Sequence, residues 1–108
     1  MSVMQVTVQE LCLQLERGAP VTILDVREPF EVELASLPGS LTIPMGEIGD
    51  RLGEIPTHRP VFVLCHHGIR SFQVAHWLRA SGFPDVTNVR GGIDAWSLEV
   101  DSEVPRYA

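Results

Sequence analysis

The stretch Val61–Ser71 decides the fold, because it joins an apolar run, VFVL, to a polar loop, CHHG, and then to a segment that begins IRS. Four consecutive apolar residues ending at Leu64 are typical of a strand covered on both faces, as in a parallel sheet. The segment after the loop has helical periodicity, and Ser71 is predicted to be its N-cap. The side chains predicted to face inward from this helix are those of Val74, Ala75, Trp77 and Leu78. The stretch therefore predicts a strand, a tight loop and a helix, which is the repeating unit of parallel α/β folds.

Cys65 stands at the end of this predicted strand. Ligands of parallel α/β sheets bind in the crevice beyond the carboxyl ends of the strands, so this position is a candidate site. Gly68 lets the loop turn tightly, and the free N–H groups and dipole of the next helix, together with Arg70, favour a thiolate over a thiol. We interpret Cys65 as an activated nucleophile, and the alternative is a small buried cysteine that contributes packing only.

Two histidines follow Cys65 directly. His66, His67 and Arg70 form a local excess of basic groups in a chain whose formal net charge is −6. Such an excess suits an anionic substrate, because the charge near a pocket can oppose the charge of the whole chain. The alternative for each histidine is an exposed loop residue without a function, and the sequence leaves both interpretations open.

The other cysteine, Cys12, lies in a predicted helix. This helix begins after Thr7, which forms a capping box with Glu10, and ends near Arg17, with Gly18 in the left-handed position that follows. Its apolar stripe consists of Val8, Leu11, Cys12 and Leu15. Cys12 is therefore predicted to be a structural cysteine in the core.

Strands and helices alternate along the rest of the chain. Apolar and β-branched runs predict further strands at residues 21–26, 41–43 and 86–89. Short helices are predicted at residues 29–34 and 47–52, and a further helix after the glycine pair Gly91-Gly92. The tail, residues 98–108, has no clear period and is predicted to run along the surface as an irregular or extended segment. The alternation predicts a parallel α/β sheet with helices on both faces, in a single domain over residues 1–108 whose core spans about residues 5–97.

Composition narrows the classes of function. The 108 residues are 44% hydrophobic, which is enough for one core and too little for two domains. The acidic balance argues against nucleic-acid binding and against an anionic membrane surface, and no apolar run is long enough to cross a membrane. Residues 1–5 lack the features of a secretory signal, and two cysteines do not make a disulfide framework, so we expect a reducing, cytoplasmic setting. A monomer is expected, since no oligomerisation motif is present.

Four motifs, in this order, resemble the single-domain rhodanese-like (thiosulfate sulfurtransferase) family. They are Asp25-Val26-Arg27-Glu28-Pro29, Leu37-Pro38-Gly39-Ser40, Cys65-His66-His67-Gly68-Ile69-Arg70-Ser71 and Gly91-Gly92-Ile93-Asp94-Ala95-Trp96. The resemblance implies a five-stranded, mostly parallel sheet with helices on both faces. It also implies that a cysteine takes sulfane sulfur from a small anionic donor such as thiosulfate, carries it as a persulfide, and passes it to a thiol or protein acceptor. No metal and no cofactor are implied.

The resemblance assigns roles by position. Cys65 matches the catalytic cysteine, and the residues that match the substrate-binding loop around it are His66, His67, Gly68, Ile69, Arg70 and Ser71. Asp25 and Arg27 match a pair that supports this loop, and the residues that match an architectural closing motif are Gly91, Gly92 and Trp96. One departure is Ser36, which stands where relatives commonly have a histidine, and this puts local packing in doubt more than chemistry.

Other functions remain open at this point. Phosphatases and arsenate reductases on a related fold place five residues between cysteine and arginine, whereas four lie between Cys65 and Arg70, which makes a smaller cradle. A metal-binding module would use Cys65 with His66 and His67, and would take a further ligand from His58 or His76. A third alternative is a sulfur carrier or regulatory protein whose donor is not thiosulfate.

Overall fold

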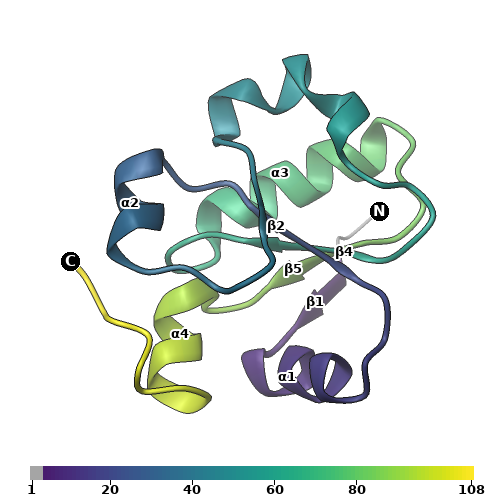
Figure 1. The fold of residues 1–108 in the computed structure, drawn as a ribbon. Helices are drawn as coiled ribbons and strands as arrows, with labels where there is room; N and C mark the ends of the chain where they lie inside the picture. Colours follow the sequence, from purple (N-terminus) through teal and green to yellow (C-terminus); the bar gives the residue numbers. More distant parts are fainter. Residues whose placement is uncertain (1–3) are drawn as a thin grey trace.

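Five strands form one sheet in the order β1-β5-β4-β2-β3, and every pairing between them is parallel. The computed structural model describes residues 4–108 (Figure 1). The strands are β1 (Met4–Val6), β2 (Thr22–Asp25), β3 (Leu41–Thr42), β4 (Val61–Leu64) and β5 (Val86–Val89). The expected α/β fold is confirmed, and the sheet is parallel throughout where a mostly parallel sheet was predicted.

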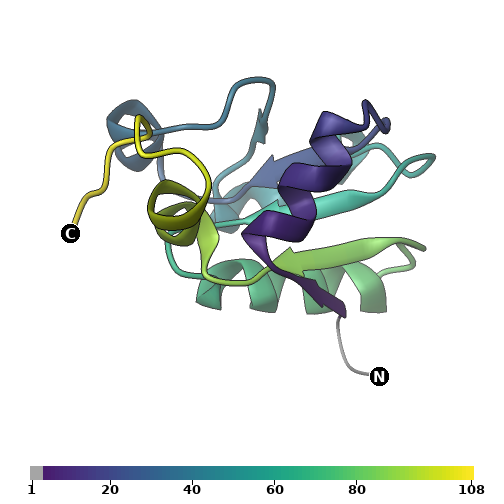
Figure 2. The same cartoon turned by 90° about the horizontal axis from the view of Figure 1, so that it is seen from below.

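The helices cover both faces of this sheet (Figures 1 and 2). They are α1 (Val8–Glu16), α2 (Pro29–Leu34), α3 (Ile69–Ala80) and α4 (Gly92–Glu99), with two 3₁₀ helices, η1 (Met45–Asp50) and η2 (Leu52–Glu54). Side chains alternate along β4, so Val63 packs in the cluster that includes α3 and η1, whereas Phe62 packs in the cluster that includes α1 and α4. All residues of β2, β4 and β5 are buried, and all of them except Asp25 and Asn88 are apolar or β-branched.

Local signals predicted most of the element boundaries. The capping box of α1 is present, since Glu10 N–H donates to Thr7 Oγ1 over 3.2 Å and Thr7 N–H donates to Glu10 Oε1 over 3.0 Å. Gly18 takes a left-handed conformation (φ +71°) as expected, and α2 has the predicted bounds. The helix expected at residues 47–52 is instead the 3₁₀ helix η1 followed by η2.

Two predictions about helix faces and caps were wrong, and a third holds in part. Ser71 is not an N-cap: α3 begins two residues earlier, at Ile69, and its cap is Gly68 (φ +99°), because the Ser71 hydroxyl is used inside the fold. Trp77 does not face inward and is 45% exposed. Cys12 packs against the core cluster as predicted, but it is only partly buried because the core stripe of α1 narrows toward the C-terminus.

The two ends of the chain were the subject of further predictions. Residues 1–3, where part of the signal-peptide argument rests, lie outside the described residues. Within residues 4–108, no helix is both long enough and apolar enough to cross a membrane. The tail begins after α4 ends at Glu99, and it is irregular as predicted.

Candidate functional site around Cys65

Cys65 follows β4 directly, at the carboxyl edge of the sheet. The N–H group of Gly68, at the N-terminus of α3, donates a hydrogen bond to Cys65 Sγ over 3.0 Å. This is one of the donors that the sequence predicted for a sulfur anion. A pocket of about 270 Å³ opens here, and its lining residues are Cys65, His66, His67, Ile69 and Arg70. The structure therefore brings five of the predicted loop residues around one cavity, with Ile69 71% exposed at its rim.

The loop is held in place by the start of α4. Ile93 N–H donates to the carbonyl oxygen of Cys65 over 2.9 Å, and Asp94 N–H donates to the carbonyl oxygen of His66 over 3.1 Å. A Cβ atom on Gly92 would lie 2.4 Å from each of these carbonyl oxygens, and Gly92 has a φ of +62°. Only glycine permits so close an approach, so the glycine motif has a structural reason.

Ser71 connects Cys65 to a buried amide, Asn88 in β5. Asn88 Nδ2 donates to the Gly68 carbonyl and to Gln5 Oε1 over 3.3 and 3.1 Å, which fixes the orientation of the amide because a carbonyl can only accept. Asn88 Oδ1 therefore faces Ser71, whose hydroxyl donates to it over 2.5 Å. The lone pairs of Ser71 are left for Cys65, whose thiol donates to Ser71 Oγ over 3.2 Å.

This network has a consequence for the sulfur. The Cys65 thiol donates its proton to Ser71 Oγ, which is possible only for the protonated sulfur. The Gly68 N–H group donates to the sulfur and would also stabilise a thiolate. Asn88 was not selected from the sequence. One signal could have found it: Asn88 interrupts a strand whose other residues are apolar or β-branched and buried. A buried amide needs hydrogen-bond partners, so such a residue indicates a polar network inside the fold.

Arg70 lies against a partner that the sequence analysis also missed. Its Nη1 and Nη2 atoms donate to Glu31 Oε1 and Oε2 over 2.7 and 2.8 Å, which is a bidentate pair. This pairing is the main reason that the pKa of Glu31 falls to about 2, and the Tyr107 hydroxyl, which donates to Glu31 Oε2 over 2.7 Å, lowers it further. The positive charge of Arg70 beside the pocket is therefore balanced by Glu31.

Asp25 and Arg27 form a buried ion pair at the end of β2, with exposed fractions of 1% and 0%. Arg27 also donates to the backbone carbonyls of Glu31 and Ala35, and to the Tyr107 hydroxyl. These contacts fix α2 and the C-terminal tail. Their connection to the Cys65 loop runs through Glu31, which holds Arg70.

The tail reaches the site, which the sequence did not predict. The Tyr107 ring stacks on the His66 ring at a centroid distance of 3.9 Å, and the His67 ring stacks on His66 at the same distance. Burial, more than any other cause, lowers the pKa of His66 and raises that of Tyr107 to about 12. His66 is half-buried in this stack, whereas the side chain of His67 is 58% exposed.

The structure changes which residues could bind a metal ion. Among residues 4–108, the side chains that gather as potential metal ligands are His66, His67 and Asp94, and Cys65 is not in this group. His58 and His76, named as further ligands from the sequence, are not in it either.

Comparison with known proteins decides the family. The family model described as the rhodanese-like domain matches residues 7–99. The chain belongs to the rhodanese-like family. A sulfurtransferase of Allochromatium vinosum is 37% identical to it over 89 residues, which cover 82% of this chain and 83% of that protein.

Two further relatives share this rhodanese-like domain. The chloroplastic rhodanese-like/PpiC domain-containing protein 12 of Arabidopsis thaliana is 46% identical over 89 residues, which cover 79% of this chain but only 30% of that protein. The crystal structure of a rhodanese-like domain protein from Staphylococcus aureus has a TM-score of 0.82 and 32% identity, and the match covers 100% of both chains.

Proposed function

We propose that this rhodanese-like domain is a sulfurtransferase of the thiosulfate sulfurtransferase type, in which Cys65 carries sulfane sulfur as a persulfide. The observation that carries this proposal is the position of Cys65 at the carboxyl end of β4, beside a pocket, with Gly68 N–H directed at its sulfur over 3.0 Å. An anionic sulfur is stabilised there by a backbone donor, and no metal or cofactor is needed. Membership of the family and the sulfurtransferase from Allochromatium vinosum support the same reaction.

The first half-reaction transfers one sulfur atom to the protein. The Cys65 thiolate attacks the outer sulfur of thiosulfate, a new S–S bond forms, and the S–S bond of thiosulfate breaks so that sulfite leaves with the electron pair. Before attack the thiol gives its proton to solvent. In the second half-reaction an acceptor thiolate, or cyanide in the assay, attacks the outer sulfur of the persulfide, and the Cys65 thiolate leaves.

The other loop residues bind and orient the donor. His66, His67 and Ile69 line the pocket that receives it, and Gly68 provides the donor to the sulfur. Arg70 also lines the pocket, but its pairing with Glu31 reduces the charge available to the anion, so we assign it a positioning role as well as attraction. Ser71 holds the thiol, and Asp25 and Arg27 fix the elements behind Glu31.

The test is thiocyanate formation from thiosulfate and cyanide. The wild type and the Cys12→Ser variant are expected to form thiocyanate at similar rates, and Cys65→Ser is expected to form none. A phosphatase or arsenate reductase is the rival, so hydrolysis of a chromogenic phosphate ester that disappears in Cys65→Ser would overturn the proposal. The physiological acceptor, a thiol or a protein, and the expected monomeric, cytoplasmic state remain predictions.

A further inference from the structure

One wall of the pocket contains a histidine nitrogen without a partner. The Nε2 atom of His66 is buried and makes no hydrogen bond. A buried ring nitrogen without a partner is unusual, because buried polar atoms are normally hydrogen-bonded. A neutral imidazole nitrogen is also the commonest metal ligand in proteins.

The neighbouring rings hold His66 in place. The centroids of the Tyr107 and His67 rings each lie 3.9 Å from that of the His66 ring, and this stacking restricts its orientation. The His66 ring is therefore fixed, yet among the described residues nothing hydrogen-bonds to its Nε2 atom.

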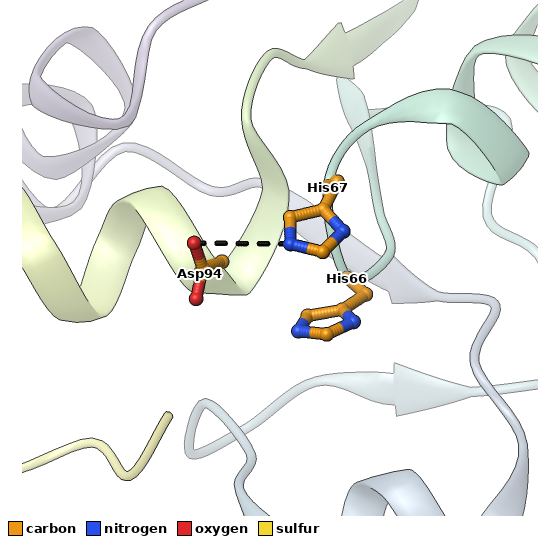
Figure 3. Close-up of side chains that lie close together, drawn as sticks. All are labelled: His66, His67 and Asp94. Atoms are coloured by element: carbon orange, nitrogen blue, oxygen red, sulfur yellow. Dashed lines mark ion pairs between the residues drawn. The ribbon is translucent and has the colours of Figure 1, made fainter. Parts of the chain in front are cut away.

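Two further ligand atoms lie beside it (Figure 3). His67 Nε2 is 3.8 Å from Asp94 Oδ2, too far for a hydrogen bond, and the ligand atoms of His66, His67 and Asp94 all lie within 4.8 Å of one another. Figure 3 shows both imidazole rings turned so that one nitrogen of each faces the side where Asp94 lies. Ligand atoms around a tetrahedral zinc ion lie roughly 3.3 Å apart, so His67, whose side chain is 58% exposed, would have to turn out of its stack on His66 to direct its nitrogen at the same ion.

We propose that His66, His67 and Asp94 form a binding site for one zinc ion, with two imidazole nitrogens and one carboxylate oxygen as protein ligands. The set is suited to a divalent transition metal rather than to magnesium or calcium, because two of its three ligands are imidazoles. It leaves coordination positions for solvent or for an anion. The site adjoins the Cys65 pocket, since His66 and His67 line both, but it does not include the sulfur.

Arg106 competes for this site. It donates to Asp94 Oδ1 and Oδ2 over 2.9 and 3.3 Å, but its side chain is 56% exposed. An exposed ion pair contributes little to stability, so zinc can displace the guanidinium at small cost. Removing Arg106 should therefore tighten zinc binding if Asp94 is a zinc ligand. If zinc binds near Asp94 without using its carboxylate, removing Arg106 should leave the affinity unchanged.

The test is isothermal titration of the untagged protein with zinc chloride. The wild type is expected to bind one zinc ion, and His67→Ala and Asp94→Asn are each expected to weaken the affinity at least tenfold. Arg106→Ala is expected to tighten it. His76→Ala is the matched control, because it removes an exposed histidine outside the group and should leave the affinity unchanged.

Three outcomes would overturn the proposal. The first is the absence of zinc binding to the wild type, and the second is an unchanged affinity in either His67→Ala or Asp94→Asn. The third is loss of binding in Cys65→Ser, since that would place the metal on the sulfur instead. Melting temperatures measured without zinc identify any variant that fails to fold, and His67→Ala, at an exposed position, keeps the test decisive in that case. None of these readouts depends on sulfur transfer.

Discussion

The two walls of the Cys65 pocket are held in different ways. On one wall, backbone amides at the start of α4 donate to the first two carbonyls of the loop, and Gly92 makes this approach possible. On the other wall, Arg70 is held by the side chain of Glu31, which Tyr107 also contacts. The first wall depends on the absence of a side chain and is insensitive to charge. The second depends on ionised groups, so pH and charge substitutions should act there.

The largest expected effect is at the backbone wall. Gly92→Ala places a Cβ atom 2.4 Å from two backbone carbonyl oxygens, at a residue with positive φ, and neither carbonyl can move without losing its bond to α4. We expect the free energy of unfolding, measured by urea denaturation, to fall by about 3 kcal/mol or more.

Gly39→Ala is the matched control for that substitution. Gly39 also has a positive φ (+80°), but nothing lies within 4 Å of the added carbon. The free energy of unfolding of Gly39→Ala should fall only by the cost of a side chain at positive φ, about 1 kcal/mol. Equal losses in the two variants would show that close packing against the loop is not what Gly92 provides.

The next effect is at the charged wall. Glu31→Gln keeps the shape of a buried side chain but removes the charge that pairs with Arg70, so we expect a loss of about 1–2 kcal/mol in the free energy of unfolding, discounted because Arg70 is a third exposed. Glu54→Gln is the control, since Glu54 pairs with Arg51 at the surface and its loss should change stability little. If both variants behave alike, burial of the Glu31 pair contributes nothing.

The pH dependence of the same pair can be predicted in sign. Folding lowers the pKa of Glu31 to about 2, below the unfolded value of about 4.3. A carboxyl with a lowered pKa stabilises the fold fully above its unfolded pKa, and this contribution is lost as the pH falls through the folded pKa. The stability difference between wild type and Glu31→Gln should therefore be constant near neutral pH and shrink from about pH 5 toward pH 2. A difference that grows on acidification would contradict the assignment.

The smallest expected effect concerns Ser71. Its hydroxyl donates to Asn88 Oδ1, and its removal leaves this buried oxygen without that donor. Ser71→Ala should therefore lower the free energy of unfolding, measured by urea denaturation, by roughly 1 kcal/mol. Equal stability of Ser71→Ala and the wild type would show that the bond to Asn88 contributes nothing.

The same two walls show how far the sequence could be interpreted. Cys65, Gly68 and the glycine pair of α4 were recognised because each depends on residues close together in the chain, at the ends of strands. Glu31 and Tyr107 were missed because their partners are far away in the sequence. Glu31 lies 39 residues before Arg70, and Tyr107 lies 76 residues after Glu31. Such pairings depend on where helices pack, which local periodicity does not determine.

Other errors have similar physical causes. Ser71 was predicted to cap α3 because serine is a preferred N-cap, but the positive φ of Gly68 ends the loop earlier and leaves Ser71 inside the helix. Trp77 was placed in the core by periodicity, although its large side chain lies at the exposed edge of the α3 stripe. The order of elements from α1 onward, in contrast, followed from strand and turn signals, whereas the short strand β1 (Met4–Val6) was not predicted.

The central claim is that Cys65 carries the sulfur, and intact-protein mass spectrometry after incubation with thiosulfate tests it most directly. The account predicts that the wild type and Cys12→Ser each gain the mass of one sulfur atom, that cyanide removes it, and that Cys65→Ser gains nothing. Retention of the added sulfur by Cys65→Ser, or its loss in Cys12→Ser alone, would contradict the account.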